Sequence, residues 1–70
     1  MILYLMAWRS LDHIVSILGD HPEGLRVKDV AGISGLSVVQ TRRALAFWVR
    51  HGQVEKFRDR NIVYYRMVTK

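Results

Sequence analysis

The chain has 70 residues, a formal net charge of +5 and no cysteine. This length predicts one domain, residues 1–70, with no room for a second. The lack of cysteine excludes disulfide bonds and thiolate metal sites, and it fits a reducing, cytoplasmic setting. Half of the residues are hydrophobic, which argues against a disordered chain.

The charge is distributed unevenly along the chain. Residues 1–37 carry three basic and four acidic side chains, whereas residues 38–70 carry eight basic and two acidic ones. Such asymmetry indicates a scaffold half and a half that faces a polyanion such as nucleic acid. A basic surface that serves only solubility is the alternative.

The first residues are apolar. The run from Met1 to Trp8 has no charged side chain, but Arg9 and Asp12 interrupt it well short of the roughly 20 residues that span a bilayer. It also lacks the basic start and the small-residue end of a signal peptide. We therefore expect no membrane partner. Residues 1–9 are interpreted as an apolar extension that either forms a dimer contact or caps the domain's own core.

Two helices are predicted in the first half of the chain. Apolar residues recur at helical spacing between Trp8 and Leu18, and residues 19–24 have the glycine and proline of a turn. This first apolar stripe consists of Trp8, Leu11, Ile14, Val15 and Leu18. Residues 25–27 predict a short extended segment, and a short helix then ends at Gly35. The apolar side of that second helix consists of Val30, Ala31 and Ile33.

The start of a third helix is the clearest boundary in the sequence. Ser37 and Gln40 fit a capping box, in which the Ser37 hydroxyl accepts from a backbone N–H and the Gln40 side chain reaches back. The pattern predicts a helix over residues 38–51 that stops at Gly52. Its inward stripe is expected to consist of Val38, Thr41, Leu45, Trp48 and Val49.

The last segment changes period. Residues 54–57 and 62–68 are rich in β-branched and aromatic residues and predict two strands, with Arg58–Asn61 as a polar tip. The predicted fold class is mainly α with a β-hairpin. In architecture this is a winged helix-turn-helix, a three-helix core followed by a C-terminal wing.

In such a fold the third helix lies in the major groove of DNA, so its outward face should hold the residues that contact bases. At 100° per residue that face consists of Val39, Gln40, Arg43, Ala46, Phe47 and Arg50, with Arg42 on its flank. Arginine suits guanine and glutamine suits adenine, because each matches the base edge with two hydrogen bonds. Val39 suits a thymine methyl group, and Ser37 with the helix N-terminus suits a phosphate.

Several of these residues have a structural alternative. Gln40 serves either base contact or only the capping box, and Arg50 either DNA or only the helix dipole. Phe47 meets a partner, the wing or a base step. For the adjacent Arg42 and Arg43 we favour DNA over simple solvation.

The predicted wing supplies a second contact. Lys56, Arg58 and Arg60 alternate toward the tip and share one face, from which they reach the minor groove or flanking phosphates. The alternative is that a charged tip only prevents pairing with other chains. The predicted DNA-binding set is Ser37, Val39, Gln40, Arg42, Arg43, Arg50, Lys56, Arg58 and Arg60.

No catalytic or metal constellation is evident. The three histidines (His13, His21 and His51) are too scattered for a metal site, and no serine has a His/Asp companion. We expect no enzyme activity, no metal and no cofactor.

The chain resembles winged-helix transcriptional regulators with MarR/ArsR-like spacing. The resemblance rests on the Gly35–Ser37 turn, on Leu45 and Trp48, and on the Gly52-x-Val54 entry into the wing. Among short members the chain is similar to the FaeA/PapI-like fimbrial regulators, which are single domains that act on DNA, in some cases beside a larger regulator. The resemblance implies that Gln40, Arg42 and Arg43 lie on the groove-facing helix.

These observations together predict sequence-specific binding of double-stranded DNA by a cytoplasmic, nucleoid-associated transcriptional regulator. The third helix would lie in the major groove and the wing, residues 54–68, on the minor groove or backbone. Its partners would be DNA and either a second copy, through residues 1–9, or a larger regulator. The alternative is a protein–protein interaction module that keeps the fold without contacting DNA.

Overall fold

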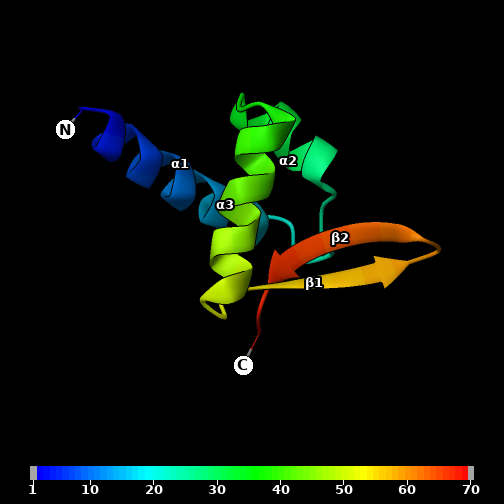
Figure 1. The fold of residues 1–70 in the computed structure, drawn as a ribbon. Coiled ribbons are helices and arrows are strands. Elements are labelled where there is room, and N and C mark those ends of the chain that lie inside the picture. Colours follow the sequence, from blue (N-terminus) through cyan, green and yellow to red (C-terminus); the bar gives the residue numbers. More distant parts are fainter. Residues whose placement is uncertain (1, 70) are drawn as a thin grey trace.

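Three helices are followed by an antiparallel hairpin. The computed structural model describes residues 2–69, and the side chains of residues 11–69. The elements are α1 (Ile2–Gly19), α2 (Val27–Ser34), α3 (Val38–Arg50), β1 (Val54–Asp59) and β2 (Ile62–Met67). Figure 1 shows the helices gathered together and the hairpin extending to one side from the end of α3. This is the predicted order of elements and the predicted fold class.

The core lies where the three helices meet the base of the hairpin. Ile14 and Leu18 of α1 are fully buried, as their helical spacing predicts, and Tyr65 of β2 closes the core from the hairpin side. The buried cluster consists of Ile14, Leu18, Val30, Ala44, Leu45, Val54 and Tyr65. Ile33 is 51% exposed, so its predicted burial is wrong. At 100° per residue Ile33 lies about 160° around the helix from Ala31, on the outer edge of the apolar side of α2.

The capping box at the start of α3 is confirmed. The Ser37 hydroxyl accepts a hydrogen bond from the Gln40 backbone N–H at 3.1 Å, and the Gln40 side-chain oxygen accepts one from the Ser37 backbone N–H at 3.2 Å. His51 is the C-cap, and Gly52 follows with φ of 77°. A side chain at position 52 would strain this left-handed backbone, which explains why the helix stops at a glycine.

A short β-bridge joins the helices to the hairpin. The backbone N–H of Leu25 donates to the Tyr65 oxygen at 2.9 Å, and the Tyr65 N–H donates to the Leu25 oxygen at 2.7 Å. The predicted extended segment is therefore present, but it ends at Arg26. Val27 already belongs to α2, because Arg26 has extended backbone angles and caps that helix.

The hairpin is longer and its turn tighter than the sequence predicts. The strands pair from Val54↔Met67 to Asp59↔Ile62, which leaves a turn of two residues, Arg60 and Asn61. Both have positive φ, 53° and 67°, as in a type I′ turn, whose twist matches that of paired strands. The expected four-residue tip is therefore wrong, because Arg58 and Asp59 belong to the ladder.

We expect Thr41→Val to stabilise the domain by about 1 kcal/mol, because a buried hydroxyl without a partner loses its hydration with no compensating bond. Thr41 is fully buried in α3, and its Oγ1 has no hydrogen-bond partner among residues 11–69. Urea unfolding followed by circular dichroism measures the change. Thr41→Ser is the control: it keeps the hydroxyl, loses the buried methyl group and should destabilise. Equal stability of Thr41→Val and the wild type would contradict this account of the site.

Candidate nucleic-acid interface

The orientation of α3 determines which of its side chains are available for contact. Thr41, Ala44 and Leu45 are buried, and Trp48 is half-buried. The Trp48 indole N–H donates to the Leu11 carbonyl at 2.8 Å, which ties α3 to α1. The inward side is thus centred between Ala44 and Leu45.

The predicted burial is wrong for two residues of the inward stripe. Val38 is 44% exposed, since it is the first residue of α3 and is not covered as Thr41 is. Val49 is 36% exposed and turns toward the hairpin. The prediction took Leu45 as the centre of the buried side and missed Ala44, so it placed the whole inward face too far around the helix.

A groove of about 560 Å³ separates α3 from the hairpin. Its walls are formed by Val27, Arg42, Ala46, Val49, Arg50, Lys56, Val63 and Tyr65. Apolar side chains form most of the surface, and Arg42, Arg50 and Lys56 supply three positive charges from both sides. The α3 side of the groove follows from helical geometry, because residues 42, 46, 49 and 50 share one side of a helix. The sequence alone does not show that Val63 and Tyr65 of the wing lie across the groove from these residues, because that is a tertiary contact.

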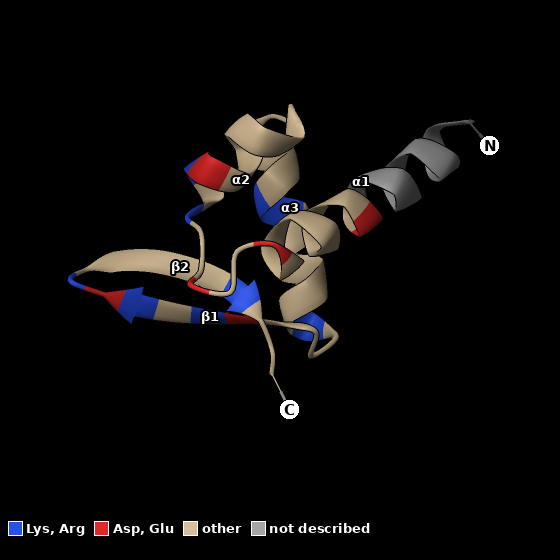
Figure 2. Cartoon of the chain, turned by 180° about the vertical axis from the view of Figure 1, so that it is seen from behind, with Lys and Arg blue, Asp and Glu red and all other residues tan. Residues whose placement is uncertain are grey.

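The two faces of the hairpin carry different charges. Residues paired directly across the strands lie on the same face, so Lys56 and Arg58 share a face with Tyr65 and Val63, which line the groove. Glu55 and Asp59 lie on the opposite face. Figure 2 shows the resulting alternation of blue and red along β1, with a blue tip. The predicted sharing of a face is confirmed for Lys56 and Arg58, whereas Arg60 lies in the turn.

Ion pairs are found away from the groove. Arg26 pairs with Asp29 at 3.1 Å and Arg66 with Glu55 on the far face of the hairpin, and the His21 ring hydrogen-bonds to Glu23 at 3.2 Å. In residues 11–69, no carboxylate pairs with any of the groove and tip cations. Those six cations are Arg42, Arg43, Arg50, Lys56, Arg58 and Arg60. Their charge is therefore left for an external anion.

The Arg26–Asp29 pair holds the start of α2. Two guanidinium nitrogens of Arg26 donate to the two carboxylate oxygens of Asp29, each at 3.1 Å. These hydrogen bonds lower the pKa of Asp29 and raise that of Arg26. Both side chains are thereby committed to the fold, in contrast to the cations of the groove.

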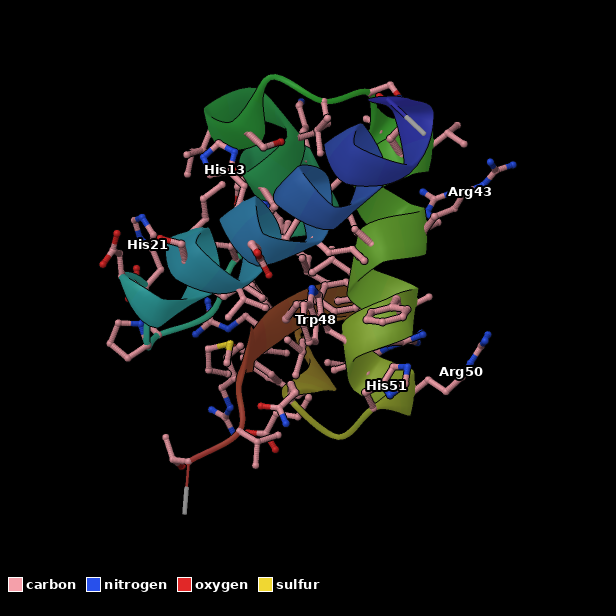
Figure 3. The ribbon with its side chains drawn as sticks, turned by 90° about the vertical axis from the view of Figure 1, so that its left-hand side faces the viewer. His13, His21, Arg43, Trp48, Arg50 and His51 are labelled. Carbon is pink, nitrogen blue, oxygen red and sulfur yellow. The ribbon has the colours of Figure 1, made fainter. Side chains whose placement is uncertain are left out.

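The predicted outward face of α3 divides into two parts. Val39, Arg43 and Arg50 lie on the exposed crest, and Figure 3 shows Arg43 and Arg50 pointing outward from the same edge of the helix. Ala46 turns into the groove, beside Arg42. The crest therefore presents Val39, Arg43 and Arg50 outward, away from the core.

Gln40 and Phe47 lie around the helix from that crest, on the flank away from the groove. Ser37 and Gln40 are exposed, but the Gln40 oxygen is held by the cap. The Phe47 ring is half-buried, 5.1 Å from the Trp48 ring and 4.2 Å from His51. Its expected place opposite the core is wrong, because those two neighbours cover it.

Residues 2–9 of the apolar extension belong to α1. The backbone of α1 begins at Ile2, so the extension continues the first helix. The predicted dimer contact of residues 1–9 depends on side chains that lie outside the described residues.

The fold has a counterpart among solved structures. The Zalpha domain from Carassius auratus PKZ, crystallised in complex with Z-DNA, superposes with a TM-score of 0.78 at 17% sequence identity. The match covers 90% of this chain and 98% of that domain. The fold is a winged helix. No protein-family model and no curated protein sequence matches the chain.

At this level of identity the likeness shows the fold alone, so the expectation that the chain has no enzyme activity stays a prediction. The likeness does not extend to a particular regulator family, so the resemblance to MarR/ArsR and FaeA/PapI-like proteins stays a prediction. Within residues 2–69, no helix is long and apolar enough to cross a bilayer. The same part of the chain contains no His, Cys, Asp and Glu group that could hold a metal ion.

We expect Gly24→Ala to destabilise the domain by about 1–3 kcal/mol and to displace the wing. Gly24 has φ of 99°, and a Cβ there would lie 2.9 Å from the Phe57 ring of β1. Thermal unfolding measures the loss. Gly19→Ala is the matched control, since a Cβ at position 19 meets nothing within 4 Å. Equal stability of the two variants would show that the Gly24 contact does not hold the wing.

Proposed function

We propose that this chain binds double-stranded DNA through α3 and the wing, and that it regulates transcription. The observation that carries the proposal is a set of six cations on α3 and the wing, none paired with a carboxylate of residues 11–69, three of which line one groove of a winged helix from both sides. Clustered cations without internal partners are what a polyphosphate backbone requires. The solved neighbour with this fold is in complex with DNA, which supports the same use here.

Binding by this surface is driven by counterion release. Each phosphate that a lysine or arginine neutralises frees condensed cations into solution, so affinity falls steeply as salt rises. Arg42 of α3 and Lys56 of β1 line the groove from its two sides, and this arrangement suits a strand of DNA backbone passing between α3 and the hairpin. The apolar floor formed by Ala46, Val49 and other side chains would pack against deoxyribose.

Sequence would be read by the crest of α3. Arg43 and Arg50 are two helical turns apart and point the same way, so both can approach the major groove together. Arginine is suited to guanine, and the exposed Val39 to a thymine methyl group. The basic tip of the wing would hold the register on the minor groove or on flanking phosphates.

One copy alone would bind weakly. A module of this size buries only roughly 600–1,000 Å² of protein surface on DNA. A second copy or a larger regulator would supply the missing affinity, and a symmetric dimer would match a palindromic site.

A second candidate function is recognition of DNA conformation rather than sequence. Two observations favour it: the solved neighbour is in complex with Z-DNA, and the capping box occupies the oxygen of Gln40. With Gln40 held in this way, fewer groups remain to distinguish bases, whereas the groove lined by Arg42, Arg50 and Lys56 can follow a backbone of particular shape.

We expect the double variant Arg42→Ala/Arg43→Ala to bind random duplex DNA at least about tenfold more weakly than the wild type at low salt, because two phosphate or base contacts are lost. The slope of log affinity against log salt should flatten by about one, because Arg42 meets the backbone and Arg43 meets base edges. Fluorescence anisotropy between about 50 and 200 mM salt measures both quantities.

The matched control is Arg26→Gln/Arg66→Gln, which removes two charges from ion pairs outside the groove and should affect binding little. If the folded wild type fails to bind near 50 mM salt, DNA is not the ligand, and the protein–protein interaction module becomes the better account.

Sequence-specific recognition predicts that selection from random duplexes converges on a common motif and that an alternating CG duplex keeps its right-handed circular dichroism spectrum when the protein is added. Both outcomes follow because the arginines of the crest would meet base edges in an ordinary major groove. An inverted spectrum without a selected motif would instead support the second candidate.

A further inference from the structure

The lining of the groove between α3 and the hairpin combines two kinds of surface. Arg42 of α3 and Lys56 of β1 stand on its two sides, and no acidic side chain of residues 11–69 lines it. Between the cations lies an apolar floor that consists of Val27, Ala46, Val49, Val63 and Tyr65. Val49 is 36% exposed, so part of this floor is open to solvent.

The pairing of the strands places Lys56 at the edge of the floor. Leu25 takes both backbone groups of Tyr65, so Tyr65 and Lys56 face each other as a pair without hydrogen bonds between them. Side chains approach most closely in such pairs. The Lys56 side chain therefore starts directly beside Tyr65, and its charge has no carboxylate partner among residues 11–69.

The α3 side of the groove is open because of a small residue. Ala46 lies one helical turn beyond Arg42 on the same side of α3, and it contributes only a methyl group. The space left here has a volume of about 560 Å³. Small-molecule sites in proteins fall in the range of roughly 300–1,000 Å³, so the groove has the size of such a site.

A DNA backbone uses only part of this lining. Its phosphates satisfy the cations, but its sugars are small and oxygen-rich and offer the floor little apolar surface. A flat apolar ring with an anionic head matches both parts at once. The ring covers the floor, and the head accepts charge-assisted hydrogen bonds from Arg42 and Lys56.

We propose that the groove is also a binding site for a small amphipathic anion, a flat apolar ring system with a carboxylate or phosphate head, and that its occupancy excludes DNA. The exclusion rests on the proposed function and deepens it, since it assigns a regulator to the surface that binds DNA. Both ligands need Arg42 and Lys56, so they compete.

The first experiment is a titration of the whole chain with 2-naphthoate, followed by the carbon-13 methyl signals of alanine and valine in NMR spectra. The signals of Ala46, Val49 and Val63 should shift and saturate with a Kd below about 1 mM. Acetate supplies only the head and 2-naphthalenemethanol only the ring. Each should bind at least about tenfold more weakly, because it uses one part of the lining. Tighter binding of 2-naphthyl phosphate than of 2-naphthoate would assign a phosphate head, and weaker binding a carboxylate.

Two variants test the two parts of the site separately. Ala46→Leu fills the groove and keeps every cation, and leucine suits an exposed helical position. Lys56→Gln removes one cation and keeps the floor. Each should weaken binding of 2-naphthoate at least several-fold. The matched control is Arg66→Gln on the opposite face of the hairpin, which should bind 2-naphthoate as the wild type does.

The second experiment measures competition by fluorescence anisotropy of labelled duplex DNA at constant ionic strength. At a concentration equal to its own Kd, 2-naphthoate should double the apparent Kd for DNA. An equal concentration of 2-naphthalenemethanol should leave DNA affinity unchanged, because it lacks the anionic head.

Several results would overturn the inference. Equal binding of acetate or 2-naphthalenemethanol, or wild-type affinity in Ala46→Leu, would show that the groove is not a site for an amphipathic anion. A response of the same methyl signals to an acidic amphipathic peptide and not to 2-naphthoate would assign the groove to a protein partner instead. Unchanged DNA affinity at saturating 2-naphthoate would overturn the exclusion alone. A wild type that binds 2-naphthoate but not DNA overturns the proposed function and the exclusion with it, whereas the ligand site stands.

Discussion

Two backbone hydrogen bonds between Leu25 and Tyr65 determine how the wing stands relative to the helices. A two-stranded hairpin by itself is marginally stable in water and has no fixed direction. The Leu25 bridge adds a third partner to its base, and Tyr65 inserts into the core from there. At the same junction, Gly24 leaves room for the Phe57 ring, since a Cβ at position 24 would lie 2.9 Å from it. This junction sets the hairpin at the angle that leaves a groove between α3 and the wing.

The hairpin's strict alternation then sorts charge by face. Since neighbouring residues of a strand point to opposite sides, a sequence that alternates acidic and basic residues places all of one sign together. Arg66 is the exception on the far face, where Glu55 neutralises it and the Phe57 ring lies 4.3 Å from its guanidinium carbon. The result is one face committed to internal pairing and one face whose charge is left for a ligand.

Local signals in the sequence predicted most of the fold. The capping box of Ser37 and Gln40 determines where α3 begins, and it involves residues only three apart. The periodicity of α1 and the change to β-rich sequence after Gly52 are likewise local. Each of these features depends on residues that are close together along the chain, so it can be predicted from a single sequence.

Features that depend on tertiary contacts were predicted less well. The predicted rotation of α3 was wrong because Ala44 is buried by contacts with other elements of the fold. A helical projection centred on Leu45 shows positions around one helix and gives no information on such contacts. The groove floor was missed because Val63 and Tyr65 reach it only through the bridge at Leu25. A turn of four residues was predicted in place of the observed two, because arginine is not a residue that two-residue turns with positive φ prefer, and Arg60 occupies such a turn.

The concentration of like charge around one groove also has a consequence for the protein without its ligand. The six cations repel one another in the folded state, whereas the unfolded chain can spread them apart, so their mutual repulsion lowers the free energy of unfolding. Salt at 0.1 M screens the repulsion between charges more than about 10 Å apart. Added salt therefore stabilises the folded state under the same conditions that weaken binding to a polyanion. A polyanion that occupies the groove relieves the repulsion directly and stabilises the folded form by mass action. The folded form is therefore more stable with a polyanion bound in the groove than without one.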